Sequence, residues 1–364
     1  MQLRTEPFRR AWEIGLLQCT AVGLAAALLA GCSLNADNSE EPKPEGSAEQ
    51  QPTEVVIATH DSWAVPEELL SRFEQESGYK LTIVPSGDAG TMTNKLVLTK
   101  GNPIADGVYG VDNTFGSRAV EEGVLADFRS EIADTAESDL PGGEGQLTPI
   151  DWGDVCVNID KTWFGEHDIP EPTTLEDLTK PAYRKLFVTP GAASSSPGFA
   201  FLLATISAYG DDWTDYWERL MANGAKLTSG WTDAYEVDFT AGGGDRPIVL
   251  SYNSSPPFTL GEDADEPTTR ALLDTCFRQV EYAGVLAGAK NAEGAEAFID
   301  FMSGVEFQES LADNMYVFPV NPAATLPPLW AKWAPAASDP LKVDPAEISA
   351  NRKEWLTTWA DITS

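Results

Sequence analysis

Carboxylates and aromatic rings recur close together along this 364-residue chain, a combination suited to binding a cation. A cation is attracted to carboxylates and to the faces of aromatic rings, most strongly where water is excluded. In so acidic a chain a single Asp can equally be a solvated surface residue, and a single ring can equally belong to the core. The carboxylates concerned are Asp61, Asp88, Asp112 and Asp151, and the rings are Trp63, Trp152, Trp231 and Tyr252.

Strands and helices alternate in the part of the chain that carries the first of these residues. Residues 55–59, 81–84 and 108–111 are short β-rich runs. Between the first two, Pro66 opens a predicted helix and Gly78 ends it. This alternation predicts a parallel sheet with ligand-facing loops at the carboxyl ends of its strands.

The loops at those strand ends are polar. They are residues 60–63 (His-Asp-Ser-Trp), 85–90 (Pro-Ser-Gly-Asp-Ala-Gly) and 112–113 (Asp-Asn), and Asp151 is also expected in a loop. Polar loops that meet at one edge of a sheet are typical of a binding site.

The rest of the chain continues the α/β pattern. The predicted elements are strands at 155–159, 248–252 and 280–286, a strand-like run at 316–320, helices around 199–206 and 298–302, and a terminal helix near Trp355 and Trp359.

Ser195-Ser196-Pro197-Gly198 has the composition of a helix start. Either serine can be the N-cap, with Pro197 at the first helical position. That role needs no ligand. The free N–H groups at such a helix end also bind anions such as phosphate, so a second role stays open.

Composition and charge exclude several classes of protein. With 24 Lys+Arg against 57 Asp+Glu, the formal net charge is -33. Nucleic acid is therefore excluded as a partner, and a soluble monomer with a cationic or neutral ligand is favoured. The chain has two His and four Cys, no Cys-x-x-Cys pair, and neither Gly-x-Ser-x-Gly nor His-Glu-x-x-His. We accordingly expect no metal site, no cofactor and no enzymatic activity.

The N-terminus predicts export. Three Arg residues precede an apolar run over 14–30, and Leu28-Leu29-Ala30-Gly31-Cys32 resembles a bacterial lipobox. We predict a lipoprotein signal peptide over 1–31, lipid on Cys32, and a body anchored to the cell membrane outside the cytoplasm. An uncleaved N-terminal anchor is the alternative. Residues 32–52 have no aromatic residue and are predicted to form a disordered tether.

Six motifs carry a family resemblance through their order and spacing, since none is diagnostic alone. Together they closely resemble the thiamine-binding subunit of bacterial ABC importers, a periplasmic-type solute-binding protein, from about Val55 to Trp359. The motifs are His60-Asp61-Ser62-Trp63, Asp112-Asn113, Asp151-Trp152-Gly153, Ser195-Ser196-Pro197-Gly198, Gly230-Trp231-Thr232-Asp233-Ala234-Tyr235 and Ser251-Tyr252-Asn253-Ser254-Ser255-Pro256.

The resemblance implies an α/β, two-lobed periplasmic-binding-protein fold of type II, with a hinge between the lobes. Lobe 1 is expected over 53–148 plus 279–318, and lobe 2 over 149–278 plus 319–364. The implied ligand is thiamine or one of its phosphate esters, held in the interlobe cleft and delivered to an ABC permease with its ATPase subunit. The implied ligand-binding residues are His60, Asp61, Ser62, Trp63, Asp88, Ala89, Asp112, Asn113, Asp151, Trp152, Ser195, Ser196, Trp231, Tyr235, Tyr252, Asn253, Ser254, Phe258 and Tyr316.

The chain departs from the family at several of these positions. His60 and Trp63 stand where relatives often have Tyr, as does Phe258, and Tyr316 stands where a Trp is expected. Phe258 keeps a stacking face and loses the hydroxyl. We expect Trp231, in a loop after Gly230, to form one face of an aromatic slot with Phe258 opposite, whereas the competing interpretation places Trp231 in the core.

Other ligands are compatible with the implied fold, because a fold does not fix a function. A polyamine would also suit an acidic cleft and is the alternative, together with a metal ion. A ferric-ion site of this kind would need two adjacent tyrosines, and Tyr252 is followed by Asn253.

Cys156 and Cys276 are the only cysteines of the expected folded body. An exported location permits a disulfide between them. The alternative is a pair of buried thiols acting as small apolar groups.

Overall fold

The structure is a computed structural model that describes residues 53–132, 138, 140, 143–261 and 264–364. The predicted signal peptide (1–31) and tether (32–52) lie outside the described residues. All described residues belong to one compact unit, so the two lobe boundaries stay a prediction. Within the described ranges no helix has both the length and the apolar character needed to cross a bilayer.

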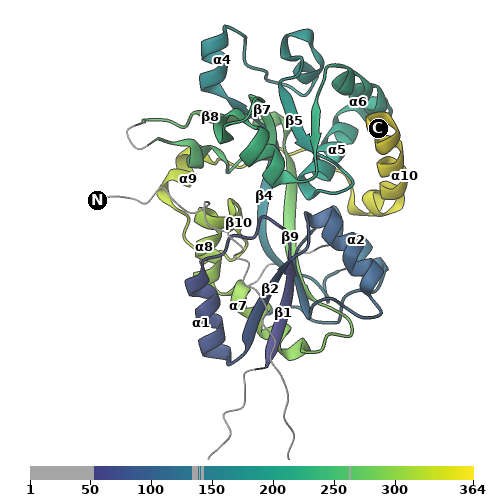
Figure 1. Cartoon of the computed structure of the whole chain (residues 1–364), viewed down its shortest axis with the longest axis vertical. Coiled ribbons are helices and arrows are strands. Elements are labelled where there is room, and N and C mark those ends of the chain that lie inside the picture. The colour runs from purple at the N-terminus through teal and green to yellow at the C-terminus, as the bar shows by residue number, and fades with distance from the viewer. Residues whose placement is uncertain (1–52, 133–137, 139, 141–142, 262–263) are drawn as a thin grey trace, which may run out of the picture. The chain divides into compact units, whose positions relative to one another are not determined.

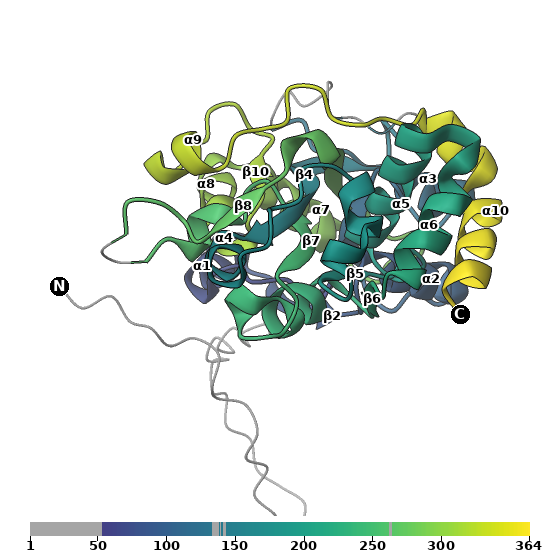
Figure 2. The same cartoon turned by 90° about the horizontal axis from the view of Figure 1, so that it is seen from above.

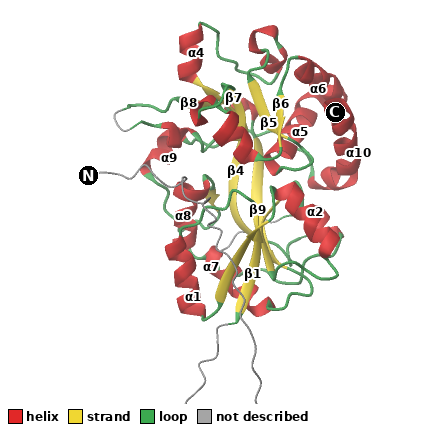
Figure 3. Ribbon diagram, viewed as in Figure 1, coloured by secondary structure: helices red, strands yellow, loops and turns green. Residues whose placement is uncertain are grey.

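A mixed sheet runs through the described chain (Figures 1 and 3). Its strands lie in the order β2-β1-β3-β9-β4-β7-β5-β6, with β8 and β10 paired to β4. The predicted parallel pairing is confirmed, since β1 runs parallel to both β2 and β3. The strands are β1 Glu54–Thr59, β2 Lys80–Pro85, β3 Gly107–Asp112, β4 Thr148–Asp160, β5 Phe187–Pro190, β6 Lys226–Thr228, β7 Ile248–Tyr252, β8 Thr269–Ala271, β9 Phe277–Val285 and β10 Phe318–Pro319.

Helices cover the sheet on both sides (Figure 2). The helix predicted from Pro66 is α1, which Gly78 ends in the left-handed conformation at φ 76°. The sequence analysis did not anticipate α3, α4, α6, α8 or α9. The helices are α1 Glu67–Ser77, α2 Ala89–Thr99, α3 Gly116–Glu121, α4 Lys161–His167, α5 Ser196–Tyr209, α6 Trp213–Ala222, α7 Ala292–Ser303, α8 Val305–Met315, α9 Pro328–Trp333 and α10 Pro345–Thr363.

Strands β4 and β9 join two halves of the sheet. We call β1, β2 and β3 the first sheet half, and β5, β6 and β7 the second sheet half. Strand β9 pairs with β3 of the first half, and β4 pairs with β7 of the second. The two joining strands pair with each other, from Thr148 opposite Ala283 to Val155 opposite Phe277.

Each sheet half has its own apolar core. In β1, Val55 and Ile57 pack with α1 and α7, whereas Ala58 packs with Met92 of α2 on the opposite face. This alternation follows from the two-residue period of a strand. In the second half, α5 is buried from Ser196 to Ile206 and packs with α6 and α10, including Trp217 and Trp359.

A disulfide joins Cys156 of β4 to Cys276, the residue before β9, which confirms the predicted pair and excludes free thiols. Both cysteines are fully buried. The bond closes a loop with a sequence separation of 120 residues. In the chain-entropy description, closing so long a loop stabilises the fold by about 4–5 kcal/mol. The disulfide thereby fixes the start of β9 against β4.

Three local predictions were wrong. Tyr316 is not part of a strand but ends α8 with φ 62°, and only Phe318–Pro319 is extended. Asp151 lies inside β4 rather than in a loop, because that stretch pairs with β9. Trp231 begins a helical turn that continues as the π-helix Asp233–Asp238, so it is not in an irregular loop. In each case contacts distant in sequence decide the local structure.

Candidate functional site

The polar ends of β1 and β2 lie side by side, as predicted for parallel strands. The Asp61 carboxylate accepts a hydrogen bond from the N–H of Gly87 (2.8 Å), and the Asp61 N–H donates to the Gly87 carbonyl (3.2 Å). The loop after β1 is thus fixed to the loop that leads into α2. Asp61 is exposed, and its two hydrogen bonds with Gly87 fix the backbone of these two loops.

Asp88 connects the two sheet halves. It is the N-cap of α2, where its Oδ1 accepts from the N–H of Ala89 (2.7 Å). The same carboxylate accepts from the N–H of Ser196 at the start of α5 (3.3 Å) and from the N–H of Trp231 (3.0 Å). Burial raises the pKa of Asp88, and the N–H donors of Trp231 and Ala89 oppose the rise.

Two further contacts join the halves beside Asp88. The Thr91 N–H of α2 donates to the Ser194 carbonyl (3.1 Å). The Ser62 and Thr232 hydroxyls lie 3.1 Å apart, within hydrogen-bond distance. Ser195 is the N-cap of α5, with its Oγ accepting from the N–H of Gly198 (3.5 Å), so Pro197 occupies the second helical position rather than the predicted first.

A buried acidic cluster lies where β3, β4 and β9 run together. The Tyr109 hydroxyl donates to Asp151 Oδ2 (2.6 Å) and to Glu281 Oε2 (3.3 Å). The Gln279 amide donates to Glu281 Oε1 (3.1 Å), and the Tyr252 hydroxyl donates to the Gln279 carbonyl oxygen (3.4 Å). All five side chains are buried, and Asp151 Oδ1 has no hydrogen-bond partner.

His60 borders this cluster. Its Nε2 lies 3.7 Å from Glu281 Oε2, and its ring centroid lies 5.4 Å from that of Tyr109. Gly110 makes room for it: a Cβ there would stand 2.3 Å from the His60 ring, and Gly110 has φ +97°. Burial lowers the pKa of His60, but Glu281, Asp88 and Asp61 together raise it by more, so the net direction is upward.

Asp112, the last residue of β3, is also fully buried. It accepts from the Thr114 hydroxyl (2.9 Å) and the Phe115 N–H (3.0 Å). Burial raises the pKa of Asp112 to about 7 despite these donors.

Four carboxylates act on Tyr252 at once. Burial raises the pKa of the Tyr252 phenol well above its ordinary value, and the charges of Glu281, Asp88, Asp151 and Asp112 raise it further. The four negative charges act on the same phenol, so a positive charge at this place is favoured.

Aromatic residues of the second half adjoin this group. Trp231 stacks on Tyr235 with centroids 5.0 Å apart, and its indole N–H donates to Ser251 (2.9 Å). Tyr316 stands edge-on to Trp231 at 6.2 Å and stacks on Phe258 at 3.5 Å. Trp231 is thus both part of the second-half core and adjacent to the candidate site, and Tyr316 connects it to Phe258.

Several of the implied ligand residues have structural partners instead. Trp63 packs against Tyr109 and Phe298, and Trp152 stacks on Phe318 with Arg278 over its ring. The remaining examples are Asn113, whose amide bonds the backbone of β9, Asn253, whose amide bonds Asp154 and Pro335, and Ser254, which donates to the Tyr316 carbonyl.

The sequence analysis missed Tyr109, Gln279 and Glu281. A signal was present: Gln279 and Glu281 alternate with Val280 and Tyr282 in β9, so both point to one face. Burying such groups is costly unless they are paired or needed for a ligand. Among the described residues no group of three or more His, Cys, Asp or Glu is arranged to hold a metal ion.

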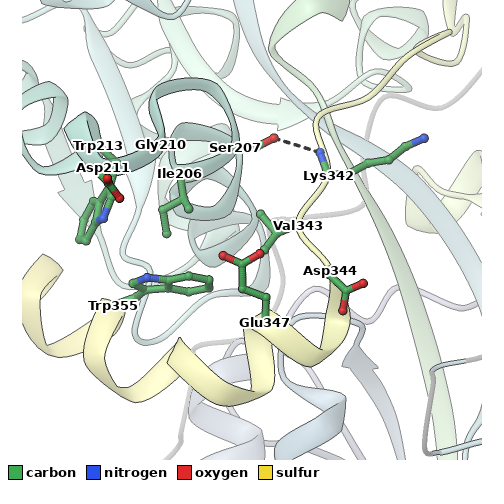
Figure 4. Close-up of a pocket in the computed structure, with 10 residues that line it drawn as sticks. All are labelled: Ile206, Ser207, Gly210, Asp211, Trp213, Lys342, Val343, Asp344, Glu347 and Trp355. Atoms are coloured by element: carbon green, nitrogen blue, oxygen red, sulfur yellow. Dashed lines mark hydrogen bonds between the residues drawn. The ribbon is translucent and has the colours of Figure 1, made fainter.

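A separate hollow of about 310 Å³ lies between α5, α6 and the segment that enters α10 (Figure 4). Trp213, Trp355 and Glu347 are among its lining residues. None of the implied ligand residues lines it, so the candidate site lies elsewhere.

The chain belongs to the bacterial extracellular solute-binding protein family, whose pattern matches residues 68–337. Its fold is the two-lobed periplasmic-binding-protein fold of type II, with a hinge between the lobes. It is 30% identical over 317 residues to the thiamine-binding periplasmic protein of Escherichia coli (strain K12), covering 85% of this chain and 93% of the relative.

Solved structures agree with this assignment. A periplasmic thiamin binding protein has a TM-score of 0.77 and 26% identity, covering 88% of this chain and 99% of that one. The iron-bound HitA from Pseudomonas aeruginosa has a TM-score of 0.66 at 20% identity, covering 86% and 100%, and this likeness concerns the fold alone.

Asp112→Asn should change how stability depends on pH. The folded pKa of about 7 lies above the ordinary 3.8, so the folded protein holds a proton that the unfolded chain releases. That contribution is complete below the ordinary pKa and is lost as pH rises through 7, a change of roughly 4 kcal/mol. Relative to the parent, the variant should gain stability across this window in urea unfolding. If the free energies of unfolding of the two proteins change with pH in parallel, the raised pKa of Asp112 is wrong.

Proposed function

We propose that this protein is an extracytoplasmic solute-binding protein that binds thiamine, or one of its phosphate esters, between the two sheet halves. It delivers the ligand to an ABC permease and its ATPase subunit. The observation that carries the proposal is the buried cluster of Asp151 and Glu281 with Tyr109, Gln279 and Tyr252, bordered by His60. The names of the relatives, which describe thiamine-binding proteins, agree with a site for a cationic ligand.

Thiamine meets the demands of this group of residues. Its thiazolium is a permanent cation, which the acidic cluster and the aromatic faces stabilise. Its aminopyrimidine brings donors, for which Asp151 Oδ1 is a buried acceptor with no partner of its own. We infer binding without chemistry, by a monomer that binds no nucleic acid and needs no metal or cofactor.

Isothermal titration of the purified chain tests the ligand. Thiamine should bind at about one per chain and raise the melting temperature by mass action. Thiamine phosphate, spermidine and ferric citrate are titrated in parallel. If spermidine raises the melting temperature while thiamine in large excess does not, the protein is a polyamine binder instead; binding of ferric ion alone would indicate an iron carrier.

Trp231→Ala and Phe258→Ala should each weaken thiamine binding by more than about tenfold, because each removes a stacking face. Trp231→Ala also removes a residue of the core and will lower the melting temperature, whereas Phe258 is only half-buried. Trp355→Ala, in the separate hollow, is the matched control and should bind thiamine like the parent. A folded Phe258→Ala variant that binds thiamine with parental affinity would show that the Phe258 ring does not contribute to the binding site.

Cys32 is proposed to carry a lipid that anchors the body to the outer face of the cell membrane. Cys32→Ser should move the protein from the membrane fraction to the soluble fraction or leave the leader uncleaved. Cell fractionation with a mass measurement of the N-terminus distinguishes these results. Normal processing with unchanged membrane partitioning would reject the anchor.

A further inference from the structure

Asp151 and Glu281 are two carboxyl groups placed face to face in the interior. They are direct partners across the antiparallel pair of β4 and β9, so their side chains emerge on the same face of the sheet. Asp151 is fully buried, and Glu281 is 6% exposed. Two like charges directly opposite in a dry interior repel strongly.

The donors around the pair do not neutralise two charges. The Tyr109 hydroxyl has one proton to share between Asp151 and Glu281, and the Gln279 amide is neutral. The cation on the same strand, Arg278, is engaged by the carboxylate of Asp154. His60 Nε2 is buried without a hydrogen bond and faces Glu281 at 3.7 Å.

We propose that Asp151 and Glu281 share one proton in the ligand-free protein, and that a cationic ligand displaces this proton to solvent when it binds. The inference rests on the proposed function for the identity of the cation. A shared proton turns the carboxyl pair into a hydrogen-bonded unit with a single negative charge. Arrival of the cation supplies the missing positive charge, so the proton leaves and both carboxylates face the ligand.

Titratable groups on several neighbouring elements affect how strongly Asp151 and Glu281 hold the proton. Burial and the charge of Glu281 raise the pKa of Asp151 well above its ordinary value, which agrees with a held proton. Asp88, Asp112 and Tyr252 add acidic groups from α2, β3 and β7. His60 and Asp112 also hold protons that a cation would expel, because the pKa of each is raised.

Titration calorimetry of the full chain with thiamine, in buffers of different ionisation enthalpy, measures the protons released. We expect roughly one proton per thiamine near neutral pH, and an affinity that rises up to about tenfold per pH unit while the pair still holds its proton. Glu281→Gln should abolish the release and flatten the pH dependence. His60→Asn should keep most of the proton release, which distinguishes a proton held by the carboxyl pair from one held by the imidazole.

Asp106→Asn is the control for loss of a buried carboxylate. Asp106 accepts from the N–H groups of Val56 and Asn291, away from the pair, and this variant should release protons like the parent. Thermal melts report whether each variant is folded. Thiamine binding with no proton release at any pH, or full release by Glu281→Gln, would overturn the proposal.

Infrared difference spectra between the ligand-free parent and ligand-free Glu281→Gln test the shared proton without any ligand. At neutral pH the parent should show a carboxylic acid C=O band that Glu281→Gln lacks, in addition to the Asp112 band that both proteins keep, and the absence of that extra band from the parent overturns the inference. If the band is present and thiamine does not bind, the proposed ligand is wrong, and spermidine replaces thiamine in the calorimetry. Binding of neither cation would refute displacement.

Discussion

The antiparallel pairing of β4 with β9 is the constraint on which the site depends. It places Asp151 opposite Glu281. It also joins the two sheet halves, because β4 pairs with β7 of the second half and β9 pairs with β3 of the first. The disulfide fixes β4 to the start of β9, and the hydrogen bond from Arg278 to Asp154 ties the same two strands. Rigid joining strands allow costly buried acids to persist, because the repulsion cannot relax by moving the backbone.

Much of the fold could be predicted from local patterns, and the acidic cluster could not. The polar ends of β1 and β2 meet because parallel strands share an edge, and the helix caps follow from residues such as Ser195 and Gly78. Asp151 was expected in a loop, since an isolated polar residue usually marks one. It lies in a strand because it pairs with Glu281, 130 residues along the chain, and with Pro319 of β10. Tyr316 was misplaced for a similar reason, because its left-handed conformation ends a helix that local composition did not reveal.

Trp231 is a core residue that also contacts the other sheet half. Trp231 belongs to the second-half core through Tyr235, yet its backbone N–H reaches Asp88 of the other half. Gly230 permits that approach, since a Cβ at its position would stand 3.0 Å from Asp88 Oδ2. The core interpretation of Trp231 is therefore confirmed, and its role in a ligand slot stays a prediction.

The contacts between the sheet halves near the site are few and individually weak. Asp88 accepts two backbone hydrogen bonds from the second half, Thr91 donates one to Ser194, and Ser62 meets Thr232. A typical hydrogen bond contributes about 0.5–1.5 kcal/mol net, so these four together stabilise closure by roughly 2–6 kcal/mol. Converting a mostly open population into a mostly closed one requires about 5.5 kcal/mol of differential binding. The four contacts are therefore of the magnitude that such a population shift requires, and a cation that relieves the repulsion among the buried acids would add to them.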